Sequence, residues 1–311
     1  MDSFMMAARV VLPMAMMVGI GMLLRIGKIT DPDTMRKVDK ITYNLFMPVL
    51  MFYNIYNTDF SLLQNVGYIL YGVAGLVITF AAAMIFVPRF IPSPATAGAY
   101  GQTLIRPNYI LFGAAVAQSI YGEGNIGIVM LMAAVAVPAF NSMASVMLES
   151  ARNGSASAKK LLIAIAKNPT VIATFLGLAV NFSGFRFPEL VLGVIEDISG
   201  LTTPISFLSI GVTLRFRAVS NKRYLFSALL LRLIVIPLIF VAGAVLAGFR
   251  GAELCAILIL FAAPVAVSSY PMAVAMDSDG DFAAQMVALS TVLCLPTMFI
   301  WTLVLNFLHM L

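Results

Sequence analysis

The chain has 311 residues, of which 61% are hydrophobic and only 11% are charged, and its mean hydropathy is +0.98. Soluble domains are about half apolar and about a quarter charged, so this composition excludes an ordinary soluble domain and indicates an integral membrane protein. The net charge of +5 does not indicate nucleic-acid binding, because the basic residues fall in loops that alternate along the chain. Cys255 and Cys294 lie in apolar runs without metal-ligand spacing, so we expect small packing side chains and no metal or cofactor.

Apolar runs long enough to cross about 30 Å of hydrocarbon as a helix recur along the whole chain. We therefore predict an all-α membrane protein with ten transmembrane helices. In the first half they cover residues 4–24, 38–57, 66–87, 97–119 and 125–148, and in the second half 161–182, 188–214, 224–247, 252–276 and 283–308.

Positive charge is unevenly divided between the loops on the two sides of this arrangement. One side carries Arg25, Lys28, Arg36, Lys37, Lys40, Arg89, Arg152, Lys159, Lys160, Lys167, Arg215, Arg217, Lys222 and Arg223. The other side has little beyond Arg9, Arg186 and Arg250. Because Lys and Arg are enriched in cytoplasmic loops, we predict a multi-pass protein of the cell (inner or plasma) membrane. Both termini would lie outside, and the central loop, residues 149–160, in the cytoplasm.

The two halves of the chain share a pattern of prolines. Pro13, Pro32 and Pro48 have the same spacing as Pro169, Pro188 and Pro204, at a constant shift of 156 residues. Since five spans per half is an odd number, the second half must enter the membrane in the opposite orientation. We predict two inverted five-helix repeats, residues 1–155 and 156–311, an architecture found in secondary transporters.

The fourth and ninth predicted spans are interrupted at corresponding places. The fourth contains Arg106-Pro107-Asn108-Tyr109, and the ninth contains Pro264 followed by Ser268-Ser269-Tyr270. Proline breaks a helix because it lacks the backbone donor and clashes with the preceding turn. Paired interruptions indicate a binding site near the middle of the membrane, where the N-terminal ends of half-helices present N–H groups and a positive dipole end. We therefore predict a two-sided, metal-free anion site with helices 4 and 9 broken and crossed.

Asn108 and Arg106 are the main candidates within this site. Asn108 is expected to contact the substrate, and capping of the broken helix is compatible with that role. Arg106 is expected to add positive charge, because charged residues at membrane depth are seldom incidental; the alternatives are snorkelling or pairing with an acid. Spans three to five contain no internal acid to serve as such a partner.

The remaining candidates have structural explanations of comparable weight. Ser268 and Ser269 would orient the anion or bond back to their own helix, and Tyr109 and Tyr270 would wall the pocket or pack. Asn44 and Thr203 complete the predicted set. Each precedes a proline in a helix that faces the crossover, and local bonding at a proline kink is the favoured explanation for both.

Three stretches of the chain together resemble a known family. They are Asn168-Pro169 with Gly177 and Pro204 to Leu214, then Asn108 to Gly113, and finally Pro264 to Ala275 with Ser290-Thr291. In order and spacing they resemble the auxin efflux carrier family, which includes plant auxin exporters and bacterial carriers of malonate or malate. The resemblance covers essentially the whole chain.

That resemblance implies a ten-helix fold related to the bile acid–sodium symporters. Helices 1, 2, 6 and 7 would form a scaffold, and helices 3–5 and 8–10 a mobile transport unit with crossed helices 4 and 9. It also implies a homodimer joined through the scaffold. The chain departs from the family in the ninth helix, where Ser268-Ser269 stand in place of the asparagine of many relatives.

We therefore predict a secondary transporter, and not an enzyme. Its substrate would be a small organic anion, such as malonate, malate or an auxin-like carboxylate, moved across the bilayer by elevator-type alternating access. The alternative is a sodium-coupled symporter of bulkier amphipathic anions, of the bile acid transporter type. Neither broken helix has an Asp or Glu at its centre, which argues against a carboxylate proton relay there and favours uniport or coupling through hydroxyl and carbonyl ligands.

Overall fold

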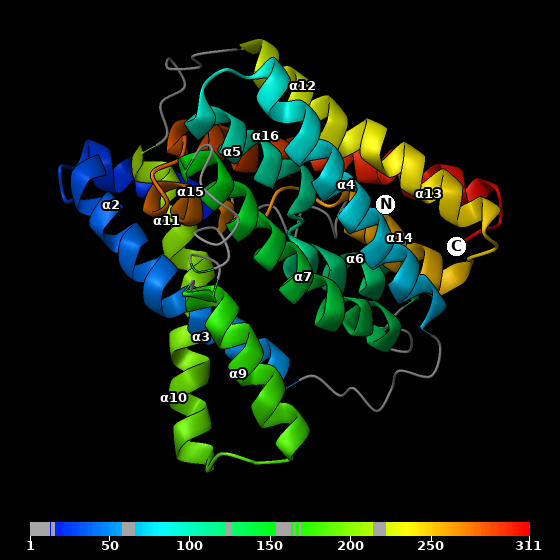
Figure 1. The fold of residues 1–311 in the computed structure, drawn as a ribbon, viewed down its shortest axis with the longest axis horizontal. Helices are drawn as coiled ribbons and strands as arrows, with labels where there is room; N and C mark the ends of the chain where they lie inside the picture. The colour runs from blue at the N-terminus through cyan, green and yellow to red at the C-terminus, as the bar shows by residue number, and fades with distance from the viewer. Residues whose placement is uncertain are drawn as a thin grey trace.

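A computed structural model of the protein describes residues 13, 16–57, 66–121, 126–153, 163, 166–167, 169–213 and 222–311. The regular structure of these residues is helical (Figure 1). In chain order the helices are Met16–Ile26, α2 (Pro32–Ile41), η1 (Thr42–Phe46), α3 (Met47–Tyr56), α4 (Gly67–Phe90), α5 (Pro94–Ile105), α6 (Tyr109–Tyr121), α7 (Ile126–Asn153), α9 (Pro169–Ser183), α10 (Glu189–Gly200), α11 (Thr202–Thr213), α12 (Lys222–Leu230), η3 (Leu231–Val235), α13 (Ile236–Leu246), α14 (Gly251–Ala262), α15 (Ser269–Ala275) and α16 (Gly280–Phe307).

The prediction of an all-α membrane protein is confirmed. Five helices of the described residues are long and apolar enough to cross a membrane: Gly67–Phe90, Leu131–Arg152, Glu189–Thr213, Lys222–Leu246 and Gly280–Phe307. The other predicted spans correspond to helices that are shorter or interrupted, or whose predicted start is not described. The count of ten stays a prediction, and most of the central loop lies outside the described residues.

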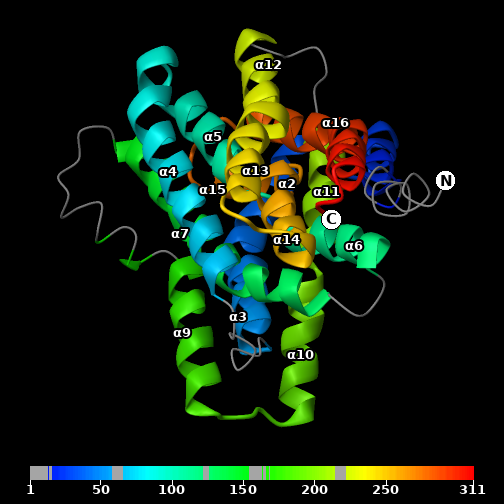
Figure 2. The ribbon, with the colours of Figure 1, turned by 90° about the vertical axis from the view of Figure 1, so that its right-hand side faces the viewer.

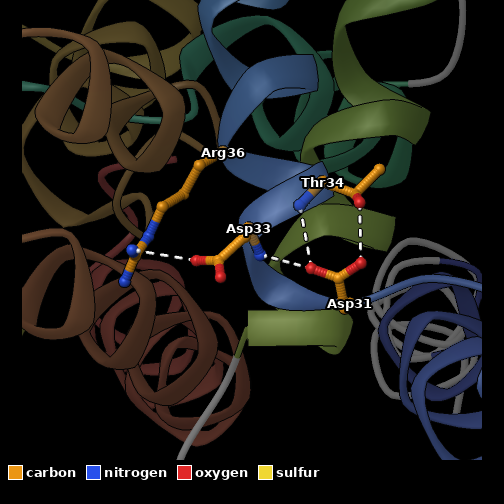
Figure 3. Close-up of polar contacts among 4 residues, drawn as sticks. All are labelled: Asp31, Asp33, Thr34 and Arg36. Atoms are coloured by element: carbon orange, nitrogen blue, oxygen red, sulfur yellow. Dashed lines mark hydrogen bonds and ion pairs between the residues drawn. The ribbon is translucent and has the colours of Figure 1, made fainter.

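Helix α2 shows how the sequence sets a helix start (Figure 3). The Asp31 carboxylate accepts hydrogen bonds from the Asp33 N–H at 2.8 Å, the Thr34 N–H at 3.0 Å and the Thr34 hydroxyl at 2.7 Å. Pro32 occupies the first helical position, where its missing N–H has no intrahelical partner to lose. The donation from the Thr34 hydroxyl, followed by the backbone donors, holds the pKa of Asp31 below its ordinary value.

Two π-helical turns stand next to prolines within longer helical rods. The turn η1 leads into Pro48, and η3 leads into Pro237. A wider turn accommodates the clash between proline and the preceding turn without ending the helix. The Leu233 carbonyl, four residues before Pro237, accepts a hydrogen bond from the Trp301 indole at 3.4 Å instead. These prolines therefore lie within continuous helical rods, unlike the prolines of the interrupted fourth and ninth spans.

The helices form two groups. The first helix group comprises α2, α3, α9, α10 and α11; its α3, α9 and α10 extend from one side of the molecule in both views (Figures 1 and 2). The second helix group comprises α4 to α7 and α12 to α16, and it forms the larger body. Helix α14 lies deep within that body, because its side chains from Leu254 to Ala262 are almost completely buried.

Helix Met16–Ile26 packs closely on α11 through two glycines. A Cβ atom on Gly21 would strike the Leu208 carbonyl oxygen, and one on Gly211 would strike the Val18 carbonyl oxygen. Small residues allow membrane helices to approach backbone to backbone, where dispersion contacts are dense. Met16–Ile26 therefore belongs with the first helix group.

Candidate functional site

The fourth and ninth spans break where the sequence predicts. Helix α5 ends at Ile105 and α6 begins at Tyr109, while α14 ends at Ala262 and α15 begins at Ser269. The two unwound segments pair with each other as an antiparallel β-bridge between Pro107 and Val265. Its hydrogen bonds run from the Asn108 N–H to the Pro264 carbonyl at 2.8 Å and from the Ala266 N–H to the Arg106 carbonyl at 3.0 Å. Non-helical backbone is tolerated at membrane depth only when protein groups or a cavity satisfy it, and this bridge does so.

Arg232 satisfies the carbonyls that the two breaks leave without a helical partner. Its guanidinium donates to the Leu104 carbonyl at 3.0 Å, to the Leu260 carbonyl at 3.3 Å and twice to the Ala263 carbonyl, at 3.1 and 2.8 Å. In a continuous helix Leu260 would accept from residue 264, which is a proline without an N–H. A cation at the C-terminal ends of α5 and α14 also complements their negative dipole ends. Arg232, which carried no signal of a role in the sequence, is fully buried and bonds to the C-terminal ends of both α5 and α14.

Arg106, in the first unwound segment, is also buried, at 1% exposure. Its Nε donates to Asn141 Oδ1 at 2.9 Å, one terminal nitrogen donates to Ser268 Oγ at 2.9 Å, and the other contacts Met272 Sδ at 3.1 Å. These partners are neutral, and the side-chain ion pairs found among the described residues do not include Arg106. Arg106 therefore does not snorkel, and no acid among the described residues pairs with it. Its hydrogen-bond partners are neutral, so its positive charge is not neutralised by them.

A cavity of about 120 Å³ adjoins the paired breaks. It lies between the two helix groups, because α3 and α11 line it from the first group and the breaks, α6 and α7 line it from the second. Its walls comprise Leu50, Met51, Asn54, Pro107, Asn108, Tyr109, Ile110, Val137, Phe140, Asn141, Thr202, Thr203, Ala266, Val267 and Ser268. No Asp or Glu is among these described lining residues.

Two polar groups of the cavity wall are buried without a hydrogen-bond partner in the described part of the chain. They are Asn108 Nδ2, on a residue that is 7% exposed, and Thr202 Oγ1, on a residue that is 1% exposed. A buried donor without a partner costs about 1–3 kcal/mol, so such groups in a folded protein call for an explanation. Asn108 also stands at the N-terminal end of the 13-residue helix α6, whose first N–H groups have no intrahelical acceptor.

The predicted site residues divide between this cavity and its surroundings. Pro107, Asn108, Tyr109, Thr203 and Ser268 line the cavity. Arg106 stands behind it, with hydrogen bonds to two of its walls, Asn141 and Ser268. The predicted members that do not line it are Pro264, whose carbonyl is in the bridge, Ser269, Tyr270 and Asn44.

Three of these residues have other surroundings. Asn44 is exposed, and its side-chain amide donates to the Lys40 carbonyl at 2.8 Å, as expected for local bonding near a proline kink. Ser269 is fully buried, and its carbonyl accepts from Gln102 at 3.1 Å. Tyr270 lines a second cavity, of about 430 Å³, at the end of α15.

Sequence reasoning missed Asn141 as a wall of the cavity. Asn141 comes from α7, a helix with no interruption to mark it. The available signal was a lone amide between apolar residues in the fifth span, since polar side chains at membrane depth face the protein interior.

The fold and this geometry define a multi-pass membrane protein with a small, mainly apolar cavity at two paired helix breaks, into whose wall a few polar side chains are set. Residues 4–302 match the family described as membrane transport protein. The chain therefore belongs to this family, that of the auxin efflux carriers, and the resemblance seen in the sequence is confirmed. It is a transporter family and not an enzyme family. The chain is also 24% identical to an uncharacterized transporter of Methanothermobacter thermautotrophicus (strain Delta H), over 97% of this chain and 99% of that protein.

Proposed function

We propose that the protein is a secondary carrier of a small organic anion, a mono- or dicarboxylate, which binds in the cavity beside the paired breaks. The observation that carries this proposal is the buried Nδ2 donor of Asn108, a lining residue of the cavity, which has no partner in the described structure. The hydroxyl of Thr202, a lining residue from α11, has the same property. A carboxylate oxygen placed between them would accept both hydrogen bonds, and bonds to charged groups are the stronger kind.

The electrostatics of the wall favour a negative ligand. Arg106 donates to Ser268 and Asn141, which both line the cavity, so its charge acts through them. A hydroxyl that accepts from a guanidinium is polarised to donate onward, and Ser268 is placed to pass that donation to an anion. The N-terminal end of α6 adds a partial positive charge from its free N–H groups. Acidic residues are not among the described walls, so nothing there repels a carboxylate.

The size of the cavity favours a small substrate. Its 120 Å³ is well above the roughly 10–15 Å³ needed for one water. It is below the roughly 300–1,000 Å³ typical of pockets for drug-sized ligands. A mono- or dicarboxylate of a few carbons fits this range better than a bulky amphipathic anion of the bile acid type.

Alternating access would follow from the position of the cavity between the two helix groups. A movement of the second helix group against the first would carry Asn108 and Arg106 past the walls supplied by α3 and α11. The helix bounds support the inverted repeat: a shift of 156 residues places α4 on 223–246 and α7 on 282–309, against 222–246 and 280–307 for their counterparts. We further propose a homodimer joined through the first helix group, with both termini outside and the central loop cytoplasmic.

The test is electrogenic transport by the protein in liposomes, recorded on a solid-supported membrane with a panel of small carboxylates, with and without sodium. Asn108→Ala should weaken apparent affinity by roughly 10- to 150-fold, since a hydrogen bond to a charged group is worth about 1.5–3 kcal/mol. Asn108→Asp, of the same shape but negative, should abolish the current. Asn57→Ala is the control, because that amide is exposed, does not line the cavity, and bonds locally to the Tyr53 carbonyl.

Two results would contradict this proposal. Full transport by both Asn108→Ala and Arg106→Ala would remove the site assignment. Currents that require sodium and a bulky amphipathic anion would favour the symporter alternative.

A further inference from the structure

Asp39 is a buried carboxylate with no role in the proposed anion site. It lies in α2 at 0% exposure, and neither of its oxygens has a well-formed hydrogen bond within the described structure. The side-chain ion pairs found among the described residues do not include it either. An ionised carboxylate buried without a cation and without well-formed hydrogen bonds costs several kcal/mol, so binding of a proton or a cation is favoured there.

Asp39 lies where the two helix groups meet. Helix α2 packs against α11 of its own group and against α15 of the second helix group. The hydroxyl groups of Ser209, on α11, and Tyr270, on α15, face the Asp39 carboxylate, although neither makes a hydrogen bond of good geometry to it. Tyr270 lies two residues after Ser268, a wall of the first cavity, so Asp39 is next to the helix that continues from the second break.

The other titratable and charged groups near Asp39 are few. Among the described residues, α11 has no titratable or charged side chain, and Tyr270 is the one titratable side chain of α15. The adjoining turn η1 contributes Tyr43, whose hydroxyl is directed to Met276 Sδ at 3.5 Å. On α2 itself, Arg36 and Lys40 line the cavity of about 430 Å³ at the end of α15, as do Asp277, Asp279 and Asp281.

Tyr270 connects Asp39 with that second cavity, because it is one of its walls while its hydroxyl faces the carboxylate. A proton could therefore leave the carboxylic acid for the phenol oxygen while the phenol proton passes to a water in the cavity. Tyr270 would remain neutral throughout, and only the charge of Asp39 would change. This path agrees with the expectation that the broken helices contain no carboxylate proton relay, because Asp39 belongs to the second predicted span.

We propose that Asp39 is a proton-binding site which, with Ser209 and Tyr270, controls the packing of α15 against the first helix group. A proton suits the site better than a metal cation. Divalent calcium takes about six to eight oxygen ligands, whereas the surroundings offer two carboxylate oxygens and two hydroxyls. The protonated acid is neutral and stays buried between the groups, while the ionised form draws in water and separates them. Protonation therefore stabilises the conformation described here, and loss of the proton favours movement of the second helix group.

The first experiment measures the proton itself, without any substrate. Infrared spectra of the purified full-length protein in lipid nanodiscs, recorded as a function of pH, should show the C=O stretching band of a protonated carboxylic acid. The band should be missing in Asp39→Asn and retained in Asp277→Asn, whose carboxylate is 70% exposed and pairs with Arg152 on the rim of the same cavity. In Tyr270→Phe the band should persist, but the proton of the Asp39 carboxylic acid should exchange for deuterium more slowly in heavy water.

Identical spectra for wild type and Asp39→Asn would overturn the proposal. A band that changes with sodium at constant pH would also overturn it, in favour of a cation site. Asn has the shape of the neutral acid, so Asp39→Asn should fold, and its unfolding temperature should not fall as the pH rises, unlike that of the wild type.

The second experiment asks whether the proton is coupled to transport, and this part rests on the proposed function. Carboxylate currents in liposomes should respond to an imposed pH gradient in the wild type and in Asp277→Asn, and should lose that response in Asp39→Asn. Currents that ignore the gradient in the wild type would refute the coupling while leaving the carrier function intact. If no carboxylate is transported at all, the proposed function fails, and the infrared measurement still decides whether Asp39 binds a proton.

Discussion

Replacement of Arg232 provides the sharpest test of how the two breaks are stabilised. In Arg232→Met a side chain of similar length fills the space, but three carbonyls, those of Leu104, Leu260 and Ala263, lose four hydrogen bonds. Hydrogen bonds between membrane helices average about 0.6 kcal/mol, which gives about 2.4 kcal/mol for four. Carbonyls left buried without donors add to this, since removing one member of a buried charged network costs about 3–5 kcal/mol. We therefore expect Arg232→Met to lower the free energy of unfolding by about 2–5 kcal/mol.

The measurement is equilibrium unfolding of the purified protein in mixed micelles with increasing SDS. Arg250→Met is the matched control, because Arg250 also donates to carbonyls at a helix C-terminus, those of Val245 and Phe249, but is exposed. Arg250→Met should change the free energy of unfolding by no more than about 0.5 kcal/mol. Arg232→Lys should be intermediate, since an ammonium keeps the charge but lacks the planar fork of donors. An Arg232→Met protein as stable as the Arg250→Met protein would refute the reasoning.

The remaining predictions concern helix packing and a helix start. Gly211→Ala should destabilise the protein by about 1–3 kcal/mol in the same unfolding assay, because the new methyl group strikes the Val18 carbonyl. Gly193→Ala, in the same rod but with open space around it, should be neutral or stabilising by up to about 1 kcal/mol. Because the pKa of Asp31 is held below its ordinary value, its cap is complete at neutral pH and weakens as the pH falls through the lowered value. Amide exchange at the start of α2 should therefore accelerate in acid, and Asp31→Ser should remove that pH dependence; equal acid sensitivity in the variant would contradict this origin.

The sequence predicted the fold well, because its signals were strong and local. Apolar runs located the helices, and Pro107 and Pro264, each followed by polar side chains at corresponding places in the two halves, located both breaks. Asn108 and Ser268 could be placed at the cavity because both are polar residues that follow the proline of a break within a few positions. What sequence could not supply was the direction of long side chains in the folded protein.

Arg232 and Arg106 illustrate that limit. Each is a lone arginine in an apolar run, and sequence alone could not separate snorkelling, ion pairing and backbone bonding. The structure gives them different surroundings, carbonyls for Arg232 and neutral side chains for Arg106. Asp39 was hidden for another reason: at the start of a predicted span, next to Lys40, it has the sequence context of a solvated helix end. The packing of α11 and α15 against α2 encloses it in the folded protein.

The β-bridge between Pro107 and Val265 has a mechanical consequence. It joins segments from the fourth and ninth spans through two backbone hydrogen bonds, and Arg232 joins the helices on either side of them. A displacement of one unwound segment therefore also displaces the other. Any movement of the second helix group must therefore displace both unwound segments together as one unit.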